Sequence, residues 1–155
     1  MQNTNEDKVI RMLKERVAGG ELNGIDVTYR ISGGAPGERL ADEEVHLSGP
    51  GLVHARVMQE SQVKQESSLN IAKPELKDVL LEISEGAGEL ISRSEARFIP
   101  DSIVGQISVK VGGHEASFFF LADEEQAKQH GKVLSPKAAH LVETMQRLHK
   151  RILQR

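Results

Sequence analysis

The sequence contains no cysteine and no tryptophan, and its only aromatic residues are four phenylalanines and one tyrosine among 155 residues. The lack of cysteine excludes disulfide bonds, thiolate metal sites and a cysteine nucleophile. Proteins that read nucleic-acid bases by stacking need exposed aromatic side chains between basic ones, so this class is a poor fit. No apolar run of about 18 residues is present, and we therefore expect no transmembrane helix.

The polar N-terminus also lacks the basic and then apolar pattern of a secretory signal. Together with the absence of cysteine, this favours a cytoplasmic protein. The chain is 38% hydrophobic and 28% charged, which is typical of a globular protein. Its length is that of one ordinary domain, so we predict a single domain over residues 1–155.

Charge is unevenly distributed along the chain. The last nine residues contain no acid but four basic side chains, Arg147, Lys150, Arg151 and Arg155. The 146 residues before them hold 16 of the 20 basic residues and all 23 acidic ones, a net charge of −7. A basic end can bind phosphate or anionic lipid, and it leaves open a nucleic-acid-binding accessory role. We favour the simpler interpretation that these cations complement the negative end of a C-terminal helix, so neither nucleic acid nor membrane is the expected partner.

Apolar spacing predicts the helices. A helix over about residues 5–18 has one apolar face, and Gly19-Gly20 ends it. Pro74 suits the first turn of a second helix, and Asp123 can cap a short third helix. The last helix, over about 136–154, begins after Ser135.

Alternating apolar residues predict a strand from Ile25 to Ile31, and two hairpins follow at about 43–59 and 103–121. The first hairpin turns at Gly49-Pro50-Gly51 and the second at Gly112-Gly113. On the apolar face, the predicted register pairs Leu47 with Val53, Val45 with Ala55, Glu43 with Val57, Val109 with Ala116, Ile107 with Phe118 and Gly105 with Phe120.

The fold class that these elements predict is α+β, with a mostly antiparallel sheet of about five strands and helices packed on one face. Residues 60–68 are polar and fit either a long loop or a strand extension. The expected core consists of Val27, Tyr29, Ile31, Val45, Leu47, Val53, Ala55, Val57, Leu76, Leu80, Ile107, Val109, Phe118, Leu141, Met145 and Ile152.

Phe119 is the one aromatic residue expected on the polar face of the second hairpin. Either the chain's own loop around Phe98 and Ile99 or a second subunit can cover it. We favour self-coverage, because the loop over 92–102 leads directly into this hairpin. A monomer is therefore expected rather than a homodimer, which remains the alternative.

Two of the six histidines, His46 and His54, lie opposite each other in the predicted first hairpin. A cross-strand pair of this kind can hold one metal ion, with Glu44 as a nearby third ligand. This gives an alternative function, a small metal-assisted hydrolase that uses the His46/His54 face. Because no short-spaced ligand motif supports it, we expect a solvated histidine pair instead.

Other catalytic patterns are weak. The sequence has no Gly-x-Ser-x-Gly elbow, and nothing places Asp101-Ser102 beside a histidine. Glu43-Glu44 and Glu124-Glu125 fit exposed faces better than a paired-carboxylate site. The stretch Gly33–Gly37 has the glycines of a phosphate loop but lacks its lysine. We assign no catalytic, cofactor-binding or metal-ligating residue and expect no cofactor.

The end of the first strand, with Arg30, Ser32, Gly33, Gly34 and Gly37, together with the order of strand, hairpin, helix, hairpin and helix, resembles emfourin-type proteins. These are small bacterial proteins named for a proteinaceous inhibitor of a thermolysin-family metalloprotease. The likeness covers the layout from about residue 24 to 155 and carries over no inhibitory residue. It implies an α+β binding protein. The expected function is therefore a non-enzymatic protein-binding or regulatory module, and protease inhibition is one such role, with a protease as the protein partner.

Overall fold

The computed structural model describes residues 4–33, 42–60, 62–92, 95–96 and 102–154. Its elements, in chain order, are α1 (Asn5–Gly19), β1 (Ile25–Gly33), β2 (Asp42–Ser48), β3 (Leu52–Gln59), β4 (Gln62–Asn70), α2 (Lys73–Gly86), the 3-10 turn η1 (Ala87–Glu89), β5 (Ile91–Ser92), β6 (Ile103–Val111), β7 (His114–Leu121), α3 (Glu124–Gln129) and α4 (Pro136–Leu153). The predicted α+β class is confirmed.

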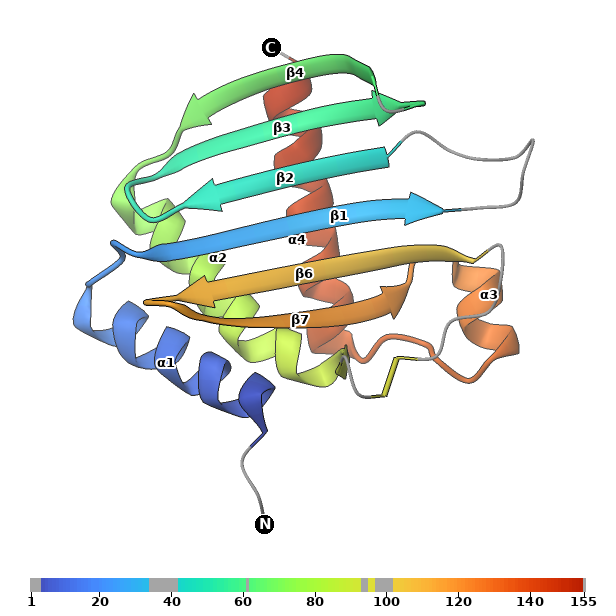
Figure 1. Ribbon diagram of the computed structural model, residues 1–155, viewed down its shortest axis with the longest axis horizontal. Helices are drawn as coiled ribbons and strands as arrows, with labels where there is room; N and C mark the ends of the chain where they lie inside the picture. The colour runs from blue at the N-terminus through green and yellow to red at the C-terminus, as the bar shows by residue number, and fades with distance from the viewer. Residues whose placement is uncertain (1–3, 34–41, 61, 93–94, 97–101, 155) are drawn as a thin grey trace.

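The strands form one antiparallel sheet in the order β4-β3-β2-β1-β6-β7-β5. Helices α1, α2 and α4 lie behind one face of this sheet, with α4 crossing β2, β3 and β4 (Figure 1). The short helix α3 contacts β7 near the end of the strand. The opposite face has none of the described helices on it (Figure 1). The sheet therefore has a helix-covered face and an open face.

The sheet has seven strands where about five were expected. The first addition, β4, occupies the segment that fitted either a loop or a strand extension. Most of its side chains are exposed on both faces, because it is an edge strand, and so its sequence carries no alternation. The second addition, β5, has only two residues, and it pairs Ile91 with Phe119.

Both hairpins have the predicted register, including Leu47 opposite Val53 and Val109 opposite Ala116. In the second turn, Gly112 and Gly113 have φ angles of 55° and 95°, which glycine adopts without strain. The helix starts also follow the sequence, since Asp123 and Ser135 accept hydrogen bonds from the backbone N–H groups of Gln126 and Ala138.

The hydrophobic core lies between the helix-covered face and α1, α2 and α4. Every residue of the predicted core is buried except Val57, which is half-buried. The correction has a simple geometric cause, since Val57 lines a cleft beside the C-terminal part of α4 and so is not fully covered. None of the described helices has both the length and the apolar character needed to cross a membrane.

Candidate functional site

The open face of the sheet carries most of the polar residues that the sequence singled out. Because side chains alternate along each strand, the register brings polar residues of six strands onto this face in continuous rows. One row reads Glu66, Arg56, Glu44, Arg30, Gln106 and Phe119 from β4 to β7, and the next reads Ser68, His54, His46, Thr28, Ser108 and Ser117.

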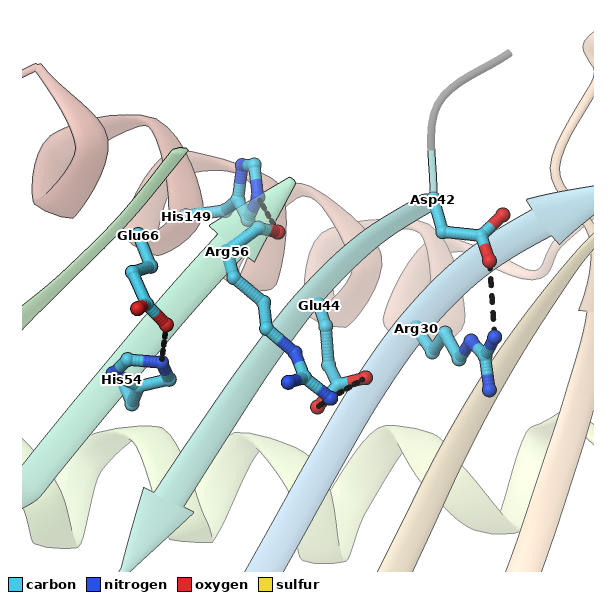
Figure 2. Close-up of polar contacts among 7 residues, drawn as sticks. All are labelled: Arg30, Asp42, Glu44, His54, Arg56, Glu66 and His149. Atoms are coloured by element: carbon cyan, nitrogen blue, oxygen red, sulfur yellow. Dashed lines mark hydrogen bonds and ion pairs between the residues drawn. The ribbon is translucent and has the colours of Figure 1, made fainter. Parts of the chain in front are cut away.

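Arginines on this face pair with carboxylates of neighbouring strands (Figure 2). A guanidinium nitrogen of Arg56 on β3 lies 3.1 Å from Glu44 on β2. Arg30 on β1 donates a hydrogen bond of 2.9 Å to Asp42 at the start of β2. Glu44 and Arg56 are directly opposite each other in the hairpin register, and each of these ion pairs restrains two side chains on an exposed surface.

His46 and His54 are opposite each other, as the hairpin register predicted, but each contacts a different carboxylate. Nε2 of His46 lies 3.3 Å from Asp26 on β1. The ring of His54 contacts β4 instead, with Nε2 3.2 Å from Glu66 and Nδ1 2.8 Å from the Ser68 hydroxyl. Among the described residues, no group of three or more histidine or carboxylate side chains is arranged to hold a metal ion. Glu44, the expected third ligand, is engaged by Arg56.

Small side chains leave a shallow hollow of about 250 Å³ in the open face. Its lining consists of Asp26, Thr28, His46, Ser108, Lys110 and Glu115. Next to it, the hydroxyl groups of Ser108 and Ser117 are 3.0 Å apart, and the Gln106 amide donates to Ser108 at 3.0 Å. The hollow is lined by charges of both signs and by hydroxyl groups, a surface that suits polar groups of another molecule.

Other histidines have partners that the sequence did not reveal. His140 on α4, which had no expected partner, lies 2.7 Å from Glu82 on α2. His149 is buried against the opposite side of the sheet, and its Nε2 donates to the backbone oxygen of Arg56 at 3.1 Å (Figure 2). Both contacts join residues far apart in sequence, so no local pattern signals them.

The basic residues near the C-terminus contact different parts of the molecule. Arg151 donates to Glu75 on α2 at 2.8 Å, and Arg147 donates to Thr144 within α4. Lys150 lines a cleft beside β2 and β3. Arg155 lies outside the described residues. The three described cations therefore do not all face one surface.

Phe119 is half-buried on the open face and lies opposite Ile91 of β5. The residues expected to cover it, Phe98 and Ile99, lie outside the described residues, and the contact with Ile91 was not predicted. Asp101 and the glycines after Gly33 also lie outside the described residues.

Strand β4 is a functional candidate that sequence reasoning did not single out. It forms one edge of the sheet, is nine residues long and contains no proline. Its side chains are mostly exposed, and Val63 is 45% accessible. At the other edge, β7 is paired in part with β5 and is contacted by α1 and α3. An uncovered edge presents unpaired backbone N–H and C=O groups that another strand can engage.

A scan against models of known protein families finds no match, and a search of curated proteins finds no similar sequence.

Proposed function

We propose that the protein is a non-enzymatic protein-binding module whose partner adds an extended segment to the edge strand β4. The observation that carries this proposal is the length and exposure of β4 at the edge of the sheet. Recognition by strand addition uses main-chain hydrogen bonds for affinity and neighbouring side chains for specificity. A nine-residue edge without proline is long enough for both.

The open face supports the same proposal, because it continues directly from β4. Glu66 of β4 contacts His54, and the rows of polar side chains extend from there to β1. These side chains are held by ion pairs between strands, so a partner would meet an ordered polar surface. The paired side chains offer polar contacts on one side of the added segment.

The partner class that we propose is a protease, and the proposed activity is its inhibition. Support comes from the resemblance to emfourin-type proteins, which rests on Arg30, Ser32 and Gly33 among the described residues. A purified thermolysin-family metalloprotease assayed with increasing amounts of the protein tests this part. Dose-dependent inhibition is expected, and full protease activity at a large molar excess would contradict it.

The absence of cysteine allows a matched test of the edge. Val63→Cys on β4 and Val133→Cys, which replaces an exposed valine between α3 and α4, each accept one bulky maleimide label. In affinity capture from a lysate of the source organism, the partner should be lost when position 63 is labelled and retained when position 133 is labelled. Equal capture by both labelled proteins would contradict binding at β4.

We also propose that the protein acts as a monomer. Phe119 is half-buried beside Ile91, which leaves less apolar surface for a second subunit to cover. Sedimentation at micromolar concentration should give one monomeric species for the wild type and for Phe119→Ser. A dimer that dissociates in this variant would contradict the proposal.

A metal assay separates this function from a hydrolase. Stoichiometric metal in the purified protein, lost together with ester hydrolysis in His46→Ala, would replace the binding module by a metal-assisted hydrolase. We expect no such correlated loss, because His46 and His54 contact different carboxylates.

A further inference from the structure

Glu43 is an acidic side chain on the helix-covered face of the sheet. The register places it opposite Ile31 of β1 and Val57 of β3, in a row that otherwise leads into the core. It is half-buried, and its carboxylate makes no hydrogen bond or ion pair with any of the described residues. Its neighbour Glu44, on the open face, has an arginine partner. A half-buried carboxylate without a partner among the described residues is available to pair with a cationic ligand.

A second polar group, the hydroxyl of Tyr29, lies close to Glu43. Tyr29 is fully buried, and its ring stacks on Phe120 with the ring centroids 6.4 Å apart. Its hydroxyl is near Gln146 and Glu43, yet it reaches hydrogen-bond geometry with none of the described residues. Burial raises the pKa of Tyr29 far above its usual value, against the opposing interaction with Gln146 and with a smaller contribution from the negative charge of Glu43, so the hydroxyl stays protonated.

Glu43 borders a cleft beside the C-terminal part of α4. This cleft has a volume of about 400 Å³ and lies between α4 and strands β2, β3 and β4. Glu43, Gln65 and Gln146 supply its oxygen atoms, and Val57 and Leu153 supply apolar surface. Gln65 also donates a hydrogen bond of 2.7 Å to the Leu153 backbone oxygen, which joins β4 to the end of α4.

We propose that this cleft binds the charged end of an alkylammonium or alkylguanidinium group. The Glu43 carboxylate attracts a cation and repels an anion, and amide oxygens accept its remaining N–H groups. Val57 and Leu153 can contact the methylene groups of the alkyl chain. The ligand is either a small free cation or a lysine or arginine side chain of another protein, since both present the same chemistry.

The cations already near the cleft do not fill this role. Lys150 lines the cleft, but its side chain is exposed and forms no ion pair among the described residues. His149 also lines the cleft, and its Nε2 is bound to the Arg56 backbone oxygen. The cation site goes beyond the proposed function, because the cleft lies on the helix-covered face, behind the open face. Cation binding in the cleft and partner binding at β4 can therefore fail separately.

Titration of the protein with n-butylammonium, followed by NMR, tests the proposal. Tyr29 is the only tyrosine, so its ring signals can be assigned directly, together with the amide signals of Glu43 and Val57. The probe should cause saturable shifts at these residues, and n-butanol at the same concentrations should not. Glu43→Gln should weaken binding about tenfold, since a hydrogen bond to a charged group contributes at least about that factor. Glu44→Gln, which changes the adjacent residue on the open face, should leave the affinity unchanged.

A short peptide with one central lysine distinguishes the two sources of the ligand. Peptide binding that is at least about tenfold tighter than n-butylammonium binding would identify a protein side chain, while equal or weaker binding would identify a small free cation. Either result supports the cleft as a cation site if Glu43→Gln weakens the binding of the tighter ligand. The absence of saturable shifts, or equal affinities of the wild type and Glu43→Gln, would overturn the proposal.

Discussion

Two adjacent glutamates, Glu43 and Glu44, show how differently the two faces of the sheet are built. Glu44 points to the open face and pairs with Arg56, in a row where other charged side chains also have partners. Glu43 points to the helix-covered face, among apolar side chains, and has no partner within the described part of the chain. The comparison separates a carboxylate that is paired within the fold from one that lines a cleft without a pairing partner among the described residues.

The difference also concerns where stability arises. Burial of apolar side chains on the helix-covered face contributes most of it, since a fully buried large side chain is worth about 1.5–3 kcal/mol. Exposed ion pairs contribute only about 0–1 kcal/mol each. Substitutions on the open face should therefore have little effect on folding, whereas substitutions on the helix-covered face should have a large one.

The largest contrast should come from two adjacent phenylalanines on opposite faces. Phe118 is buried in the core and Phe119 is half-buried on the open face. Phe118→Ala should lower the free energy of unfolding by about 3–5 kcal/mol, because it leaves a cavity in the core. Phe119→Ala should cost about 1 kcal/mol, in proportion to its smaller burial. Urea denaturation followed by circular dichroism measures both, and equal losses would remove the distinction between the faces.

Gly105 tests how tightly the helix-covered face is packed. A Cβ atom at this position would overlap the Phe120 ring, which covers the glycine backbone. Gly105→Ala should therefore lower the stability by about 1–3 kcal/mol through overpacking. Gly113→Ala meets no atom but has a strained φ, so Gly88→Ala in η1, where the space is open and φ is not positive, is the better control. A neutral effect of Gly105→Ala would show that the ring moves freely.

Tyr29 makes the stability of the helix-covered face sensitive to alkaline pH. Its folded pKa is raised by burial, so above the unfolded value of about 10 the native state holds a proton that the unfolded state has lost. Its contribution is fully present below pH 10, and above it the stability should fall by up to about 1.4 kcal/mol per pH unit. Tyr29→Phe should reduce this slope in denaturation measured between pH 8 and 11. An unchanged slope would assign the alkaline effect to other groups.

The smallest effects should distinguish the two glutamates by sign. Glu44→Gln should lower the stability by less than about 1 kcal/mol, because Arg56 loses its charged partner. Glu43→Gln should leave the stability unchanged or raise it slightly, because it removes a half-buried charge that has no partner. Thermal unfolding of the two variants in parallel gives the comparison. A larger loss for Glu43→Gln would indicate that this carboxylate already has a stabilising partner.

The parts of the fold that the sequence predicted well are those in which a local pattern determines the structure. Gly112-Gly113 and the alternation on either side fixed the second hairpin and its register. Strand β4 was left open between a loop and a strand, because an edge strand exposed on both faces shows no alternation. Val57 was expected to be buried but is half-buried beside a cleft. The spacing of apolar residues along a strand does not reveal which part of the sheet α4 leaves uncovered.

The candidate sites were less predictable, because they depend on contacts between distant residues. The pairing of His46 with His54 follows from one hairpin, but their carboxylate partners lie on β1 and β4. His140 and Glu82 are 58 residues apart, and Arg151 and Glu75 are 76 residues apart. The cleft beside Glu43 likewise requires α4 to cross the first half of the sheet, which no local motif reveals.

The central position of β1 has a consequence for how the chain folds. Strands β1 to β4 pair in succession and β6 pairs with β7, so both halves of the sheet can form from neighbouring segments. They are joined by β1 and β6, whose residues Val27 and Val109 are 82 positions apart. Closing so long a loop costs chain entropy before its contacts form, and non-local pairing of this kind slows folding. Formation of the β1–β6 seam is therefore the step expected to limit the folding rate.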